Sequence, residues 1–169
     1  FDIGRKPEAD YTWKKDCYHP GELLQLSDAT AYTTPPKSWS WRYNGIEFNN
    51  TKNATFLKTD TGFISIEYIV KTDYYDCHDT VVKDIYLRPT VLVTADGYFS
   101  DFETGRTGWF ISDTSSIWSF GEPSGTMIKS AASGTKAWFT AKLSDGNSSI
   151  ESPCFDLSYM NRPVIKLNI

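Results

Sequence analysis

The sequence predicts an all-β protein, and three observations support this prediction. Aromatic residues make up 15% of the 169 residues, and most stand beside Thr, Ser, Val or Ile, which favour strands. Short alternating or β-branched runs recur about every 8–20 residues, with Gly, Pro, Asn, Asp and Ser between them. No convincing amphipathic helix occurs, because the best window, Glu22–Ala31, is short and contains a Leu-Gln-Leu alternation.

The first half of the chain contains six candidate strands. Each is rich in β-branched or aromatic residues, and several alternate apolar with polar side chains, as half-buried strands do. They are Asp10–Trp13, Leu23–Ser27, Ser38–Tyr43, Thr55–Leu57, Phe63–Lys71 and Thr80–Leu87. Trp39 and Trp41 share parity and should face one side. We expect Trp41, Phe63, Ile66 and Tyr68 to form the core and its flanking faces.

The second half contains six further candidates after a boundary near Leu87–Val91. Pro89 cannot donate to a ladder and keeps Arg88 extended, while Gly- and Ser-rich loops and three tryptophans follow. The candidates are Gly97–Phe102, Gly108–Ser112, Trp118–Phe120, Lys136–Thr140, Ser148–Ser152 and Val164–Asn168. We therefore predict two modules, residues 8–90 and 95–169, with residues 1–7 as a linker or strand from a preceding region.

Charge and hydropathy exclude several classes of function. A net charge of −4 argues against nucleic-acid binding, which needs a clustered basic face. No window approaches 18 consecutive apolar residues, so membrane insertion is not predicted. The opening FDIGRKPEADY is no secretory signal. Because both ends have strand-like sequence, we expect them to have been cut from a longer chain.

Three cysteines occur, Cys17, Cys77 and Cys154. We favour a Cys17–Cys77 disulfide, which would close a loop of roughly 60 residues, contribute about 4 kcal/mol and indicate an oxidising, extracytoplasmic compartment. The alternative is a zinc site that adds His19 and His78. Adjacent ligands in a strand point to opposite faces, which argues against zinc. Cys154 would then be buried or paired with a cysteine outside this sequence.

Five motifs follow in order in the first module. They are Ala9-Asp-Tyr-Thr12, Cys17 with Gly21-Glu-Leu-Leu24, Trp39-Ser-Trp-Arg-Tyr-Asn-Gly45, Gly62–Val70 and Cys77-His-Asp-Thr80. Together they resemble the Cys-bearing PKD domain that is common in secreted and surface proteins of Bacteroidetes. The resemblance implies an Ig-like β-sandwich with a spacing or adhesion role.

Five more motifs follow in the second module. They are Asp96–Glu103, Gly108-Trp109, Trp118–Pro123, Ala131–Thr140 and Ser152–Ser158. They resemble the opening half of a MAM-like jelly-roll module, a companion of PKD repeats in large Bacteroidetes surface proteins exported by the type IX system. The resemblance implies a partial jelly-roll sandwich whose apolar faces and sheet edges lie open, which is an association hazard.

The stretch Gly121–Thr140, GEPSGTMIKSAASGTKAWFT, has the composition of an active-site loop but lacks the spacing. A phosphate loop needs Gly-x4-Gly-Lys-Ser/Thr, whereas three residues separate Gly121 from Gly125, and Thr126 follows. A serine nucleophile would need a Gly-x-Ser-x-Gly elbow, which does not occur. We therefore predict a long jelly-roll loop between two strands.

Asp101 and Glu103 are the candidate metal ligands. They share strand parity and could project together. Paired carboxylates serve glycosidases, but hard oxygen ligands suit a structural calcium ion better. A solvated acidic pair is the remaining interpretation, and no other cofactor is expected.

The tryptophans and tyrosines suggest a glycan-binding alternative. Trp39, Trp109 and Trp118 are the candidate contacts, and Trp39 with Tyr43, Tyr74 and Tyr75 is a possible aromatic platform. The competing interpretation is that these aromatic side chains belong to the core or to a tyrosine-rich surface without a ligand.

The leading hypothesis is a non-enzymatic segment of a large secreted or cell-surface protein, on the exterior of a bacterial outer membrane. It would act in adhesion, spacing or partner attachment, in the manner of gliding-associated and adhesin-type proteins. Its partners would be other domains of a longer chain and a protein or glycan at the cell surface. The alternative is a carbohydrate-binding accessory module of a secreted hydrolase or protease.

Overall fold

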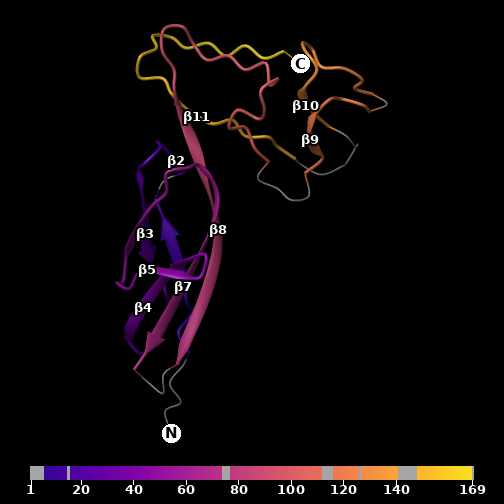
Figure 1. The fold of residues 1–169 in the computed structure, drawn as a ribbon. Coiled ribbons are helices and arrows are strands. Elements are labelled where there is room, and N and C mark those ends of the chain that lie inside the picture. The colour runs from indigo at the N-terminus through magenta and orange to yellow at the C-terminus, as the bar shows by residue number, and fades with distance from the viewer. Residues whose placement is uncertain are drawn as a thin grey trace. The chain divides into compact units, whose positions relative to one another are not determined.

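The computed structural model describes residues 6–14, 16–73, 77–111, 116–125, 127–140 and 148–168. Every regular element in these ranges is a strand, which confirms the all-β prediction (Figure 1). The chain forms two compact units that divide between Pro89 and Thr90. Within the ranges that the structure describes, no helix is long and apolar enough to cross a membrane.

Two sheets form the first unit. The smaller is antiparallel in the order β1-β3-β6, with β1 at Tyr11–Trp13, β3 at Leu23–Asp28 and β6 at Ala54–Leu57. The larger has neighbours in the order β8-β7-β4-β5, with β4 at Pro36–Tyr43, β5 at Ile46–Asn49, β7 at Gly62–Thr72 and β8 at His78–Leu92. The short β2 (Cys17–Tyr18) pairs in parallel with Arg88 and Pro89 of β8.

Side chains at alternate positions along the strands fill the space between these two sheets. In β7, Ile64, Ile66, Tyr68 and Val70 are buried at every second position, as the period of a strand requires. Phe63 has the opposite parity and is 61% exposed. The predicted core positions Ile66 and Tyr68 are therefore confirmed, and Phe63 lies on the outward face.

Three aromatic rings form the centre of this core. Trp41 and Tyr68 stack with ring centroids 3.9 Å apart, and Tyr11 meets Trp41 edge-on at 5.2 Å. All three side chains are fully buried. The Trp41 indole Nε1 donates to the Thr51 carbonyl oxygen at 2.9 Å, which satisfies the polar atom that its burial would otherwise leave without a partner. Trp39 packs against the same core, as its parity predicted.

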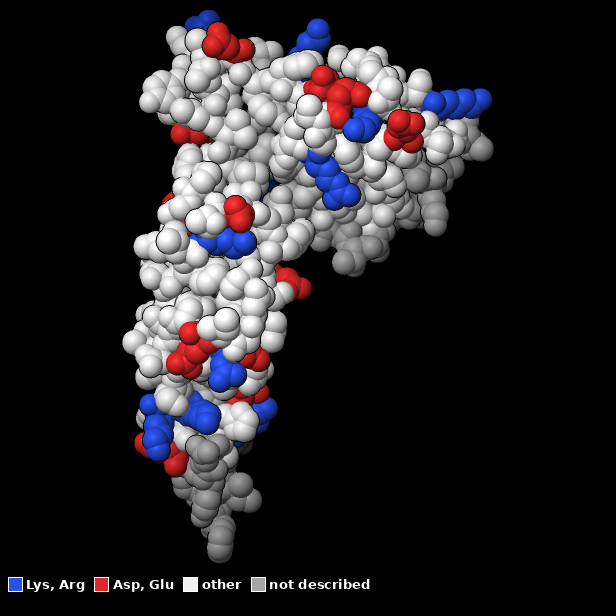
Figure 2. Space-filling view, in the orientation of Figure 1, with Lys and Arg blue, Asp and Glu red and all other residues white. Residues whose placement is uncertain are grey.

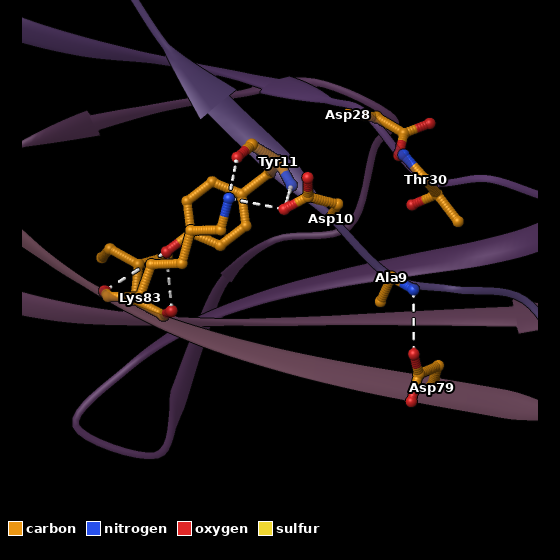
Figure 3. A network of polar contacts seen from close by, with 8 residues as sticks. Ala9, Asp10, Tyr11, Asp28, Thr30, Asp79 and Lys83 are labelled. Carbon is orange, nitrogen blue, oxygen red and sulfur yellow. Dashed lines mark hydrogen bonds and ion pairs between the residues drawn. The ribbon is translucent and has the colours of Figure 1, made fainter.

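A polar network joins the start of the chain to β8 (Figure 3). The Tyr11 hydroxyl donates to the Ile66 carbonyl oxygen at 2.9 Å and lies 3.3 Å from that of Lys83. In return, Lys83 Nζ donates to the Tyr11 carbonyl oxygen at 2.7 Å and pairs with Asp10. The hydrogen bond from Lys83 lowers the pKa of Asp10, and burial raises the pKa of Tyr11. Asp79 adds a bond from the Ala9 N–H.

Tyr11→Phe is expected to destabilise the first unit by about 1–3 kcal/mol, because the buried carbonyl oxygen of Ile66 loses the Tyr11 hydroxyl as its donor. Urea unfolding followed by circular dichroism measures the change. Tyr32→Phe is the control, since Tyr32 is 44% exposed and should change stability little. Equal stability of the two variants would contradict the network's role.

The second unit contains three strands among its described residues. β9 (Trp118–Gly121) pairs antiparallel with β10 (Ala137–Thr140), so the predicted strands at 118–120 and 136–140 are confirmed. β11 (Cys154–Asp156) pairs in parallel with Thr90–Leu92 of β8. Phe110 and Glu151 form an isolated bridge.

Three predicted strands of the second unit are wrong, at 97–102, 148–152 and 164–168. The first contains a turn, since Gly97 and Phe102 both have positive φ, which extended pairing does not tolerate. The second makes only the Glu151 bridge. The third has β-branched sequence but no partner strand in the described residues. A fourth predicted strand, 108–112, is also wrong, because its described residues make only the Phe110 bridge; its last residue, Ser112, lies outside the described residues.

Candidate functional site

The disulfide joins Cys17 to Cys154, and Cys77 is a free thiol. The predicted Cys17–Cys77 bond is therefore wrong. Cys77 precedes the first residue of β8, whereas Cys17 pairs with Arg88, ten residues further along that strand. At about 3.3 Å per residue the two positions are roughly 30 Å apart, far beyond the reach of a disulfide. Cys154, in contrast, pairs with Thr90 of the same strand.

The same separation removes the zinc alternative. Cys17 and Cys77 lie near opposite ends of β8, and Cys17 is oxidised, so neither geometry nor thiolate chemistry suits one tetrahedral site. Within the described residues, no group of three or more His, Cys, Asp or Glu is arranged to hold a metal ion.

The three candidate tryptophans all have packing partners. Trp39 lies against the core of the first unit. In the second unit, Trp109 meets Phe102 edge-on at 5.8 Å, and Trp118 Nε1 donates to the Ser148 carbonyl oxygen at 3.2 Å. Glycan contact by these residues stays a prediction, and their packing gives each a structural role. Tyr74 and Tyr75 lie outside the described residues.

Arg106 lies over two aromatic rings of the second unit, those of Trp138 and Phe120. The Arg106 guanidinium carbon lies 5.4 Å from the centre of the Trp138 ring and 5.9 Å from that of Phe120. The two rings are 5.2 Å apart. These cation–π contacts hold the turn that contains Arg106 against β9 and β10, so the ring faces serve the fold of the second unit.

The Glu103 carboxylate is held by a backbone nest at the end of the Gly121–Thr140 stretch. It accepts hydrogen bonds from the Thr135 N–H at 2.9 Å, the Thr135 hydroxyl at 2.8 Å and the Lys136 N–H at 2.8 Å. Gly134 has φ +63°, and a Cβ there would lie 2.5 Å from Glu103 Oε1, so a side chain would fill the space of the carboxylate. Successive N–H groups of this kind form anion sites, and here the anion is internal.

Asp101 supports the same turn, since its Oδ1 accepts from the Glu103 N–H at 3.1 Å. The backbone and side-chain hydrogen bonds from Lys136 and Thr135 lower the pKa of Glu103. Calcium binding by Asp101 and Glu103 stays a prediction. It would compete with the three hydrogen bonds that occupy the Glu103 oxygens.

Glu103→Ala is expected to loosen the loop at 134–136, because the N–H groups of Thr135 and Lys136 lose their acceptor. Amide hydrogen exchange at these two residues should accelerate at neutral pH. In the unmutated chain the protection should be present above the ordinary carboxyl pKa of 4.5 and disappear as the pH falls below it through the lowered pKa. Glu122→Gln, at an exposed position, is the control; equal exchange in both variants would refute the nest.

A shallow depression lies beside β2 and β3. Its lining residues are Lys14, Tyr18, Gly21, Glu22, Leu23 and Gln25. Burial raises the pKa of Tyr18 to about 12, so its phenol stays protonated at neutral pH. This depression offers one cation and one carboxylate at an open surface.

The outward face of the β5-β4-β7-β8 sheet is the most regular exposed surface of the first unit. We call this the outward sheet face. Phe63 stands opposite Tyr86, with ring centroids 4.7 Å apart. The next outward pair is Ser65 and Asp84, joined by a hydrogen bond from the serine hydroxyl to the carboxylate. Glu67 follows, opposite Val82, which is 57% exposed.

Charged side chains lie at the middle of this face. Arg42 of β4 pairs with Glu67 of β7 at 3.7 Å and stands opposite Glu47 of β5. The Ser40 hydroxyl donates to the Glu47 carboxylate. On the face of the molecule that Figure 2 shows, acidic and basic side chains are interspersed.

Comparison with known proteins finds likeness only among solved structures. No family model and no curated protein matches the chain. The PKD1 domain of Vibrio anguillarum Epp is 16% identical with a TM-score of 0.42, over 50% of this chain and 95% of that domain. The PKD1 domain of the Vibrio cholerae metalloprotease PrtV is 20% identical with a TM-score of 0.42, over 49% of this chain and 98% of the domain.

A third similar structure is described as that of carbohydrate-binding modules from the β-sandwich superfamily. It is 15% identical with a TM-score of 0.46, and the match covers 81% of this chain and 54% of that one. Likeness at this level assigns the chain to no family.

Sequence reasoning missed the outward sheet face. Phe63 and Tyr86 belong to predicted strands, but their pairing depends on the register of β7 against β8. The parity of Phe63, opposite to that of Ile64 and Ile66, is the signal that would have placed its ring on the surface.

Proposed function

We propose that this chain is a non-catalytic segment of a large secreted or cell-surface protein that acts in adhesion, spacing or partner attachment. One observation carries the proposal: two charged side chains that could act as an acid or a base, Lys83 and Glu103, are occupied by contacts that hold the fold together. Lys83 is held by Asp10 and the Tyr11 carbonyl oxygen. Glu103 is held by Thr135 and Lys136.

Compartment and context support the same proposal. A Cys17–Cys154 disulfide persists in oxidising surroundings such as the outside of a cell. The resemblance of residues 8–90 to a PKD domain and of residues 95–169 to half a MAM-like jelly roll favours a Bacteroidetes surface protein. We propose export by the type IX system to the exterior of the outer membrane, with further domains of a longer chain as neighbours.

Two measurements test this proposal. The purified chain is incubated with a panel of peptide, ester and glycoside substrates, and we expect no turnover above buffer. Beads coated with the chain are then placed on surfaces coated with polysaccharide or with matrix protein, and we expect retention under flow on at least one of them. Turnover by the chain, or release from every surface at the rate of albumin-coated beads, would refute the proposal.

A second candidate function is a carbohydrate-binding accessory module of a secreted hydrolase or protease. The observation that favours it is the Phe63–Tyr86 ring pair. These rings stand on two hydrogen-bonded strands, with Phe63 61% exposed. Aromatic rings held by a rigid sheet suit a surface that binds through stacking.

A further inference from the structure

We infer that the outward sheet face binds a neutral glycan, with the Phe63–Tyr86 ring pair as its stacking surface and the Ser65–Asp84 pair as its first hydrogen-bonding group. The inference rests on the second candidate function, the carbohydrate-binding module, and names its ligand class. Four observations carry it: the exposure of the rings, the order of the pairs along the strands, the charge of the face and the place of its charged residues.

The rings lie on a rigid support. β7 and β8 pair continuously from Gly62 opposite Leu87 to Lys71 opposite His78, so the backbone beneath Phe63 is held by a ladder. The Phe63 side chain nevertheless stays 61% exposed. The π face of an aromatic ring is negative, whereas the C–H groups on the face of a sugar ring are slightly positive. A pyranose can therefore stack on the exposed part of the Phe63 ring.

Polar groups follow at the spacing of the strand. Ser65 and Asp84 are two residues from Phe63 and Tyr86, which places them roughly 7 Å further along the same face. The Asp84 carboxylate accepts one hydrogen bond from Ser65, and its other lone pairs can accept hydrogen bonds from sugar hydroxyls. Glu67 repeats this acceptor chemistry at the next outward position.

The charge of the face selects among glycans. Glu47, Glu67 and Asp84 face outward, and the cations with the same parity are Arg42, Lys71 and Arg88, which acts on Tyr86. Three carboxylates and three cations leave the face without net charge, so it has no field that would concentrate a polyanionic polysaccharide. A neutral glycan needs no such field, because its hydroxyl groups donate to these carboxylates.

The position of these charges also argues against a protein partner. The buried centre of a protein interface is depleted in charged residues, whereas Arg42 and Glu67 lie on β4 and β7, the central strands of this face. Covering them with a protein would desolvate both charges. A hydrated sugar chain leaves them in contact with water.

Isothermal titration calorimetry with the full chain tests the inference. The probes are cellohexaose, chitohexaose, xylohexaose, laminarihexaose and mannohexaose, with polygalacturonate and dextran sulfate as polyanions. We expect at least one neutral probe to bind and neither polyanion to compete. Failure of all neutral probes to bind, or tighter binding of a polyanion, would overturn the inference. Neither result involves turnover, so the proposed non-catalytic role is judged separately.

Matched variants place the binding on this face. Phe63→Ala is expected to weaken binding by about tenfold, the order of an aromatic stacking contact. Phe99→Ala removes a ring that is 83% exposed in the second unit and should leave binding unchanged. Asp84→Asn should weaken binding while Asp60→Asn, whose side chain is 82% exposed, should not. Unchanged binding by Phe63→Ala with an intact circular dichroism spectrum, or capture of a protein in place of glycan, would refute the site.

Discussion

Trp41→Ala is expected to destabilise the first unit by about 3–5 kcal/mol, the largest effect of any single substitution considered for this chain. Trp41 is fully buried and stacks on Tyr68, and its indole nitrogen donates to Thr51. Truncation removes the ring, leaves a cavity between the two sheets and leaves the Thr51 carbonyl oxygen without that donor. Because a close-packed core relaxes only in part, the neighbouring rings will not fill the space.

Hydrogen exchange of the β4 and β7 amides measures this loss within the first unit itself. Ile46→Ala is the control, since Ile46 belongs to the same sheet but is 74% exposed; a surface change of this kind stays within about 0.5 kcal/mol. Equal protection of these amides in the Trp41→Ala and Ile46→Ala variants would contradict the role of the three-ring cluster as the centre of the core.

Removal of the Cys17–Cys154 disulfide is the second large effect. The double variant Cys17→Ser/Cys154→Ser is expected to lose about 5 kcal/mol, because the bond closes a loop of roughly 140 residues in the unfolded chain. Urea unfolding of the oxidised chain and of the variant measures the difference. A reducing agent added to the unmutated chain should reproduce it.

Cys77→Ser is the matched control, because Cys77 is a free thiol and its loss breaks no cross-link. Peptide mapping without reduction should find Cys17 joined to Cys154, and one alkylated cysteine at position 77. A Cys17–Cys77 peptide, or equal stability of the double and single variants, would contradict the observed pairing.

The strands of the first unit follow closely from local sequence. β7 alternates apolar and polar side chains over most of its length, and the sandwich buries one set at every second position. The short strands β2, β5 and β11 were not predicted. β5 follows the Asn44-Gly45 turn, where both residues have positive φ, and an Asn-Gly pair of this kind is a strong hairpin signal. β2 and β11 have only two and three residues, too few for a pattern to emerge.

The candidate site could be predicted only in part. The sequence identified Glu103 and the glycine-rich Gly121–Thr140 stretch as separate features, and the fold joins them through Thr135 and Lys136. The aromatic content suggested a sugar surface, and the tryptophans chosen for it are partly buried, while Phe63 is 61% exposed. Residue type alone does not distinguish a core ring from a surface ring.

Local sequence by itself determined the all-β class, most strands of the first unit and the burial of Trp41, because side-chain alternation and β propensity act between near neighbours. The tertiary structure alone decided that Cys17 joins Cys154, that Glu103 occupies the nest at Gly134–Lys136, and that Phe63 stands beside Tyr86 on the outward sheet face. Each of these depends on strand register or on contacts between residues far apart in the chain, and a shift of one residue would turn each strand's side chains to the other face.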